Sequence, residues 1–203
     1  MILSEPPVRH PFTPLKVVLL TGLSDPATCA LSAVQTRFLA SLAAPETAKI
    51  YWNFPYLPSS NARRDPPLWL ASIRNTRQFF QASRPAYREH WRALAASAES
   101  LVVITGSCGL EIFNQCREAR DPVGHVFALG PVARERPAVP HTLIQGTRDL
   151  FSRMFFRECH VELSGVGHMN YLDDCRVQRL INDYLCSSTS PSPAADSTCR
   201  SAG

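Results

Sequence analysis

The sequence contains no long hydrophobic run. None of its apolar stretches approaches the ~20 consecutive residues that a membrane-spanning helix requires. Residues 1–16 carry prolines and charges where a secretory signal peptide would carry an apolar run. With 45% hydrophobic and 19% charged residues in a chain of 203, the composition is that of an ordinary globular protein, long enough to bury a sizeable core. We therefore expect no membrane partner.

Dense clusters of basic residues are also absent. The 21 Lys and Arg residues outnumber the 17 Asp and Glu residues, which gives a formal net charge of +4, but only Arg63–Arg64 and the pair Arg134 and Arg136 lie close together in sequence. A nucleic-acid surface needs denser basic patches to neutralise successive phosphates. We expect no nucleic-acid partner, although a mildly basic face would suit an acidic partner such as a carrier protein.

Cysteine pairs with metal-ligand spacing are missing as well. The seven cysteines are an odd number, and none of them forms a Cys-x-x-Cys pair. Most of them lie inside apolar segments. This usage predicts free thiols in a reducing cytoplasm, with no bound metal and no cofactor.

Short apolar blocks alternate with amphipathic segments along the chain. The block LKVVLLTG (15–22) closes with glycine and is typical of a strand buried on both faces, and the segment 29–43 then repeats apolar residues at helical spacing. Further strands are expected over 49–57, 100–106, 125–130, 141–146 and 159–165, and further helices over 86–98, 109–119, 149–156 and 171–185. The alternation predicts an α/β fold, a three-layer sandwich in which a mostly parallel sheet of about six strands carries helices on both faces.

The domain organisation follows from composition. Residues 1–186 are expected to form a single α/β domain, in which the proline-bearing connection 57–86 is the one irregular region large enough to shape a pocket. The tail 187–203 is small, polar and proline-bearing, and is expected to be disordered.

The end of the third expected strand carries the strongest chemical signal. There the chain runs through Thr-Gly-Ser-Cys-Gly directly into a helix, which is the arrangement of a nucleophile elbow. The elbow requires small residues two positions before and two after its nucleophile. With Ser107 as nucleophile these are Thr105 and Gly109, whereas with Cys108 one of them is Leu110, which would crowd the helix. The pattern favours Ser107.

This turn resembles the elbow of the α/β-hydrolase family, and the resemblance covers roughly residues 15–185. The family motif is usually G-x-S-x-G, and here it reads T-x-S-x-G. IQGTRD is similar to the family's G-x-x-D after a late strand, which implies that Asp149 is the triad acid. GVGHMNYL is similar to its histidine loop, which implies that His168 is the base. The order Ser…Asp…His also agrees with the family.

The resemblance implies a serine hydrolase that cleaves a carboxylic ester or thioester through an acyl-enzyme. His168 would remove the proton of the Ser107 hydroxyl, and Asp149 would hold the imidazole in the correct tautomer. Two backbone N–H groups would stabilise the oxyanion, one from Cys108 and one from Leu23 in the loop after the first strand. The expected partner is a small-molecule acyl ester or thioester, which includes conjugates with a carrier protein or coenzyme A.

The expected substrate contacts are mostly apolar. Phe54, Trp69 and Met169 are expected to line the site, together with Ser24, which is also the fallback for the second oxyanion donor. The short spacing between nucleophile and acid leaves no room for an inserted helical cap, so any cover over the site must come from 57–86. The sequence thus predicts a minimal, capless enzyme whose substrate has an apolar acyl part.

Several alternatives stay open at this stage. Glu135, in the loop after the strand expected over 125–130, is a rival to Asp149 as triad acid. Acyl transfer or lactone formation would need only a different acceptor for the same intermediate. A non-catalytic small-molecule binding protein or a lyase could use the same fold, and a frame shifted by one residue would make the protein a Cys108-dependent hydrolase.

Overall fold

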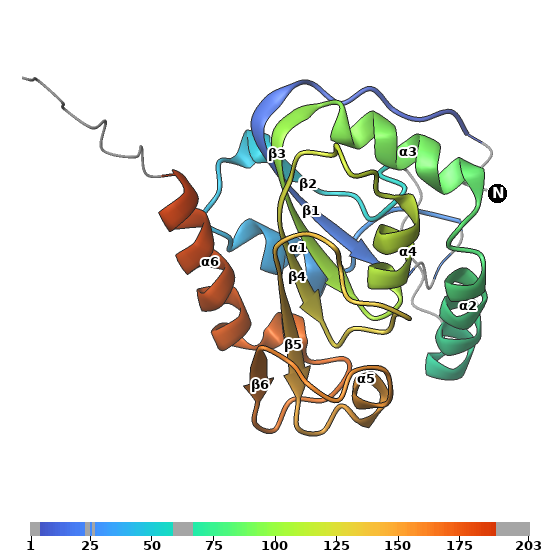
Figure 1. Cartoon of the computed structure of the whole chain (residues 1–203), viewed down its shortest axis with the longest axis vertical. Helices are drawn as coiled ribbons and strands as arrows, with labels where there is room; N and C mark the ends of the chain where they lie inside the picture. The colour runs from blue at the N-terminus through green and yellow to red at the C-terminus, as the bar shows by residue number, and fades with distance from the viewer. Residues whose placement is uncertain (1–4, 23–24, 26, 59–66, 190–203) are drawn as a thin grey trace, which may run out of the picture.

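Six strands form the sheet at the centre of the molecule (Figure 1). The computed structural model describes the chain except for residues 1–4, 23–24, 26, 59–66 and 190–203. The strands are β1 (Thr13–Thr21), β2 (Lys49–Ile50), β3 (Ala98–Gly106), β4 (Val123–Leu129), β5 (His141–Gly146) and β6 (Val161–Leu163). They are hydrogen-bonded in the order β2-β1-β3-β4-β5-β6, and every neighbouring pair is parallel. All six carboxyl ends therefore meet at one edge of the sheet.

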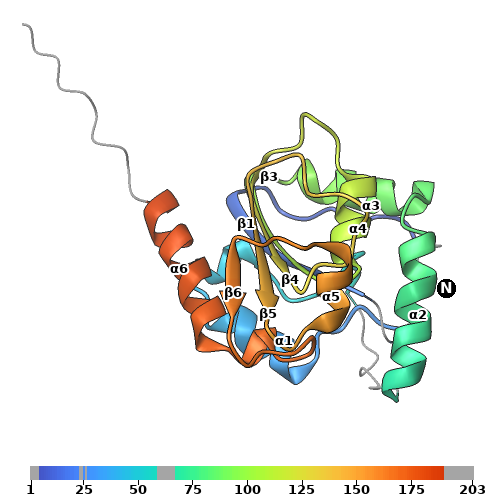
Figure 2. The same cartoon turned by 60° about the horizontal axis from the view of Figure 1, so that its bottom comes forward.

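Helices cover both faces of the sheet (Figures 1 and 2). One face carries α1 (Ala33–Ala40) and α6 (Cys175–Thr189), and the other carries α3 (Pro85–Ala95) and α4 (Gly109–Cys116), with α2 (Leu68–Phe80) beside α4. Three shorter elements are α5 (Leu150–Phe155) and the 3-10 turns η2 (Glu46–Ala48) and η3 (Tyr171–Asp173). Along β1, side chains alternate between the two apolar layers, because successive residues of a strand point to opposite faces. The predicted three-layer α/β sandwich is confirmed.

The layer on the α3 and α4 side contains the largest buried side chains. Trp91 of α3 is completely buried and packs edge-to-face on Phe113 of α4, with ring centroids 5.3 Å apart. Its indole N–H donates to the Asp121 carboxylate at 2.6 Å, so the polar tip of the ring is satisfied. Burial of an aromatic side chain of this kind stabilises the fold by roughly 1.5–3 kcal/mol.

The second strand is much shorter than the expected 49–57. β2 ends at Ile50, because the side chain of Asn53 takes over the pairing with β1. Its Oδ1 accepts a hydrogen bond from the Thr21 amide at 2.9 Å, and its Nδ2 donates to the Thr21 carbonyl at 3.1 Å. Pro55 follows without an N–H group to donate, and Tyr56 has a positive φ of 66°, so the backbone leaves the ladder here.

Two further expectations about element boundaries are wrong. The connection 57–86 is not irregular throughout, because the 13-residue helix α2 lies within it. Two of the prolines that suggested irregular structure stand at helix starts: Pro67 precedes α2 and Pro85 opens α3. At the other end of the chain, α6 continues to Thr189 and so includes the first residues of the expected tail. The remainder of that tail lies outside the described residues. No helix in the described part of the chain is long and apolar enough to cross a bilayer.

Three histidines gather near the amino ends of β4, β5 and β6. His125 contacts the Thr142 hydroxyl at 2.9 Å, and His160 accepts a hydrogen bond from the Leu143 amide at 2.9 Å. The rings of His141 and His160 are 5.2 Å apart. Burial lowers the pKa of His125 and of His160, and the positive charge of neighbouring histidines lowers it further. Folding therefore favours the neutral form of His125 and of His160.

We predict that the fold loses stability as the pH falls below about 6.5, because the unfolded chain then takes up protons that the folded histidines resist. His160→Asn removes one of these groups and keeps an oxygen that accepts from the Leu143 amide. Urea unfolding at about pH 7.5 and about pH 5 should show a smaller loss of stability in this variant than in the wild type. Equal losses would show that His160 does not contribute, and would assign the loss to another titrating group such as His125, whose pKa burial also lowers.

Candidate active site

Ser107 stands on a strained turn between β3 and α4. It has a positive φ of 53°, a conformation that costs a residue with a Cβ of the order of 1–3 kcal/mol. Neighbouring backbone groups hold it there: its N–H donates to the Leu129 carbonyl at 3.2 Å, and its carbonyl accepts from the Val132 amide at 3.1 Å. A Cβ at position 109 would collide with the carbonyl oxygen of Leu20, so only glycine lets α4 approach β1 this closely. The sequence argument about small residues has this physical basis.

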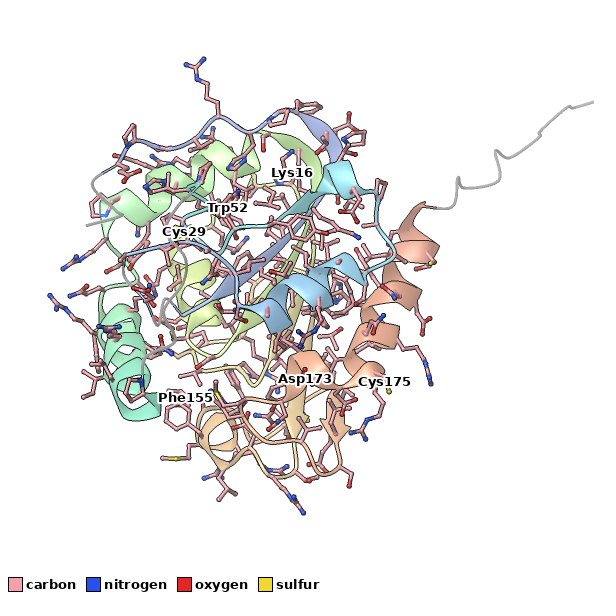
Figure 3. All side chains as sticks on the ribbon, turned by 180° about the vertical axis from the view of Figure 1, so that it is seen from behind. Lys16, Cys29, Trp52, Phe155, Asp173 and Cys175 are labelled. Carbon is pink, nitrogen blue, oxygen red and sulfur yellow. The ribbon has the colours of Figure 1, made fainter. Side chains whose placement is uncertain are left out.

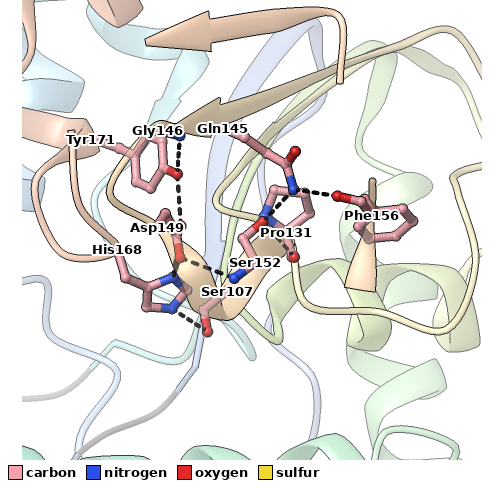
Figure 4. A network of polar contacts seen from close by, with 9 residues as sticks. All are labelled: Ser107, Pro131, Gln145, Gly146, Asp149, Ser152, Phe156, His168 and Tyr171. Atoms are coloured by element: carbon pink, nitrogen blue, oxygen red, sulfur yellow. Dashed lines mark hydrogen bonds and ion pairs between the residues drawn. The ribbon is translucent and has the colours of Figure 1, made fainter. Parts of the chain in front are cut away.

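The three residues of the expected triad come together at the carboxyl edge of the sheet (Figure 4). Asp149 follows β5 and is the N-cap of α5, while His168 lies in the loop between β6 and η3. The Nδ1 of His168 is 3.0 and 2.9 Å from the two carboxylate oxygens of Asp149, and its Nε2 is 3.1 Å from the Ser107 hydroxyl oxygen. A carboxylate only accepts hydrogen bonds, so Nδ1 carries the proton and Nε2 is free to accept the serine proton.

The Asp149 carboxylate is buried and fully engaged in hydrogen bonds. Besides His168, its Oδ1 accepts from the Ser152 amide at 2.9 Å and its Oδ2 accepts from the Tyr171 hydroxyl at 2.7 Å. Burial alone would raise the pKa of the Asp149 carboxyl, but these hydrogen bonds outweigh it and hold the pKa below its usual value. The acid thus stays ionised at neutral pH.

Tyr171 is a site residue that the sequence reasoning missed. Its hydroxyl accepts from the Gly146 amide at 2.7 Å while it donates to Asp149, and burial raises its pKa. Gly130, at a positive φ of 51°, makes room for this pair, because a Cβ there would lie 2.6 Å from both the Asp149 carboxylate and the Tyr171 ring. The only sequence signal was its position three residues after His168, which fits an ordinary core aromatic equally well.

Cys108 is placed for a backbone role and not for nucleophilic attack. Its side chain is 2% exposed, and burial raises the pKa of its thiol to about 12, so the thiolate is scarce. A Cβ on Gly22 would lie 2.9 Å from its sulfur, which places Gly22 against the elbow. The Cys108 backbone is at the N-terminus of α4, where the helix dipole favours negative charge. Leu23 and Ser24 lie outside the described residues, so the second oxyanion donor stays a prediction.

Of the expected apolar substrate contacts, one is buried in the core, one is exposed beside the site, and one has a side chain outside the described set. Phe54 is 1% exposed and packs against Tyr56 and Tyr87, with ring centroids 5.5 and 5.4 Å away, so its expected role as a substrate contact is wrong: it is a core residue. Met169, next to His168, is 69% exposed and remains available. Trp69 lies in α2, but its side chain is outside the described set.

Glu135 does not take part in the hydrogen bonds around His168. Its side chain is exposed in the loop after β4, where its backbone carbonyl accepts from the side-chain amide of Asn114 at 2.8 Å. Both carboxylate oxygens next to the imidazole belong to Asp149. The geometry therefore favours Asp149 over Glu135 as the acid.

Helix α2 reaches the elbow through Asn75. The Asn75 carboxamide occupies the space beside Gly22 that a side chain at position 22 would fill, next to the Cys108 sulfur. Its Oδ1 is buried and has no hydrogen-bond partner in the described structure. Most buried polar atoms in native proteins have a hydrogen-bond partner, so an atom of this kind is uncommon. In the same described part of the chain, no group of three or more His, Cys, Asp or Glu side chains is arranged to hold a metal ion.

We predict that Tyr171→Phe lowers the free energy of unfolding by about 1–3 kcal/mol, because the Gly146 amide and the Asp149 carboxylate both lose a buried partner. The deficit should shrink as the pH falls below about 4, since the hydrogen bond favours the ionised carboxyl and is lost when Asp149 is protonated. Urea unfolding across this pH range measures both effects. Tyr184→Phe, which lies beside His125 far from Asp149, is the matched control. A deficit independent of pH would contradict the coupling to Asp149.

Comparison with known proteins gave no match, either to a protein-family model or to the sequence of a curated protein.

Proposed function

We propose that this protein is a serine hydrolase of the α/β-hydrolase type, which cleaves a carboxylic ester or thioester through an acyl-enzyme. The observation that carries the proposal is the continuous hydrogen-bond chain from Ser107 through His168 to Asp149 (Figure 4). A late-strand aspartate or a serine in a tight turn is common by itself. Here the serine, histidine and aspartate are joined in one series of hydrogen bonds, and the serine has a positive φ on a strand-to-helix turn. This arrangement fits the geometry that nucleophilic catalysis requires.

Acylation would begin with attack of the Ser107 hydroxyl oxygen on the substrate carbonyl carbon. His168 Nε2 takes the hydroxyl proton as the new C–O bond forms, and Asp149 stabilises the imidazolium without accepting the proton. The negative charge on the carbonyl oxygen develops near the Cys108 N–H. Collapse of this intermediate breaks the bond to the leaving oxygen or sulfur, and the imidazolium gives its proton to that atom. An alcohol or thiol leaves, and the acyl group stays on Ser107.

Deacylation would run through the same groups in reverse roles. His168 takes a proton from a water molecule, whose oxygen attacks the acyl carbon, and then returns the proton to Ser107 as the carboxylic acid leaves. If an alcohol or amine replaces water as the acceptor, the same intermediate gives acyl transfer, and a hydroxyl on the acyl group itself gives a lactone. His168 is 25% exposed at its side chain, so an acceptor can reach it from solvent.

The proposed substrate is a small-molecule acyl ester or thioester, which includes carrier-protein and coenzyme-A conjugates. We place the enzyme in the cytoplasm on the strength of its cysteines. All six cysteines in the described part of the chain are free, as expected for a reducing compartment. Among the alternatives, a Cys108-dependent hydrolase is disfavoured by the burial of that thiol, and a non-catalytic binding protein has no need of the complete triad geometry.

We predict that Ser107→Ala abolishes both burst acylation of an activated ester and covalent labelling by a fluorophosphonate, because no other described group holds the nucleophile position. Cys108→Ala keeps the backbone N–H and should retain activity within about tenfold. Intact-mass spectrometry of the labelled proteins and burst kinetics give both readouts. Labelling of Ser107→Ala together with an inactive Cys108→Ala would move the nucleophile to the cysteine.

We predict that Asp149→Asn lowers kcat by up to about 10⁴-fold, because an amide in this position leaves the imidazole in the wrong tautomer. Glu135→Gln, the matched control for the rival acid, should change kcat by less than about threefold, as expected for an exposed surface charge. Steady-state ester hydrolysis measures both, with circular dichroism to show that each variant is folded. The reverse ranking of the two variants would assign the acid to Glu135.

A further inference from the structure

Helix α5 has its polar side turned inward and its apolar side turned outward. Of its six residues, Ser152 is the buried one. Its hydroxyl donates to the Pro131 carbonyl at 2.9 Å and accepts from the side-chain amide of Gln145 at 2.9 Å (Figure 4). Leu150, Phe151, Met154 and Phe155 are all exposed, with exposed fractions of 74%, 49%, 80% and 40%. An ordinary surface helix shows the opposite arrangement.

The large apolar side chains that are exposed in the described part of the chain are concentrated on two helices and beside His168. In the described chain, seven of the eight large hydrophobic residues that are exposed belong to α5, to α2 or to the position after His168. These seven are Ile73, Phe80, Leu150, Phe151, Met154, Phe155 and Met169, and the eighth is Phe12, which precedes β1 at the opposite end of the strands. Scattered exposed apolar residues need no explanation, but a cluster of this kind marks a binding surface.

The aromatic members form a continuous series that begins at the catalytic base. The Phe151 ring stands edge-on to the His168 imidazole at 5.4 Å, and the Phe155 ring lies 5.8 Å beyond it. Phe155 in turn faces Phe79 of α2 at 6.0 Å, as its position between α5 and α2 in Figure 3 shows. The Arg134 guanidinium covers the Phe79 ring at 4.7 Å. We name Phe151, Phe155 and Phe79, with the exposed Met154, the acyl track.

The acyl track is fixed in position relative to the triad. Asp149 caps α5 through the Ser152 amide with the same carboxylate that orients His168. The helix is also tied to β6 by the ion pair between Arg153 and Glu162, with N and O 2.6 Å apart. Arg153 is the one charged residue of α5, so its apolar face carries no charge that would have to be desolvated when a chain lies on it.

We infer that the acyl group of the substrate is a medium or long alkyl chain and that it lies along the acyl track, from the Ser107 ester past Phe151 and Phe155 toward α2. The inference rests on the proposed function. The series starts at the reacting atoms, which favours a part of the substrate over a protein partner. A fully buried methylene group is worth about fourfold in binding, and a chain lying on an open surface is covered on one side, so we expect about twofold per methylene.

The test is the ratio of kcat/KM for p-nitrophenyl decanoate to that for p-nitrophenyl acetate, measured at monomeric substrate concentrations. The wild type should give a ratio of at least about 100. Phe155→Ser and Met154→Ser should each lower this ratio, the former at least tenfold. Phe12→Ser, which changes another exposed apolar residue at the far end of the strands, is the matched control and should leave the ratio unchanged. A ratio near one in an enzyme that hydrolyses both esters would overturn the acyl track and leave the proposed function standing.

A second measurement does not depend on turnover. Isothermal titration calorimetry should show that decanoate binds to Ser107→Ala. The double variant that also carries Phe155→Ser should bind decanoate at least tenfold more weakly. Failure to hydrolyse any ester, together with no fluorophosphonate labelling, would reject the proposed function, and the decanoate titration would then decide on the surface alone. Absence of decanoate binding overturns the acyl track. A dimer contact would also overturn it. In that case the wild type would be a dimer in analytical ultracentrifugation, and the acyl-track variants would be monomers with an unchanged ester ratio, because the surface would then be a contact between copies.

Discussion

The buried carboxylate of Asp149 joins the two segments of the chain that follow β5 and β6. Its oxygens accept hydrogen bonds from the His168 imidazole, the Ser152 amide and the Tyr171 hydroxyl. An ionised carboxylate loses several kcal/mol of hydration when it is buried, and hydrogen bonds to the charged form are what make its burial tolerable. The same bonds therefore keep the acid charged, fix the orientation of the base and set where α5 begins. A substitution of any one of the three donors should therefore disturb the hydrogen bonds that the other two make to Asp149.

The sheet explains why these donors meet at all. In a parallel sheet every strand ends at the same edge, so the residues after β3, β5 and β6 become neighbours, although Ser107 and Asp149 precede His168 by 61 and 19 positions. The close approach then depends on the absence of side chains at two positions. Gly109 lets α4 lie against the β1 carbonyl of Leu20, and Gly130 lets the Asp149 and Tyr171 pair pack over the end of β4. The positive φ of Ser107 is the local strain that this packing imposes and supports.

The alternation of strands and helices, and the meeting of Ser107, Asp149 and His168, could be predicted from the sequence because their signals are local. Apolar blocks closed by glycine predict buried strands, and the order of the motifs relates each residue to a strand end. What could not be predicted depends on contacts between distant residues. The early end of β2 depends on a side-chain pairing of Asn53 with Thr21, and the assignment of Phe54 to the core depends on Tyr87, neither of which a local pattern contains. Helix α2 was missed because prolines were interpreted as breaks, although a proline at a helix start is favourable.

Helix α5 shows most clearly how a tertiary contact overrides a sequence pattern. From its composition, Leu150, Phe151 and Phe155 would be expected to face the core, and Ser152 the solvent. The rotation of the helix is instead set at its first residue, because the Asp149 side chain must cap the Ser152 amide while it holds His168. Ser152 is thereby directed inward, where its hydroxyl finds the Pro131 carbonyl and the Gln145 amide as partners. Leaving large apolar side chains in water forgoes roughly 1.5–3 kcal/mol for each one that could have been buried. This arrangement forgoes that stabilisation several times over beside His168, and it agrees with the acyl track that we infer there, where a bound alkyl chain would cover these side chains.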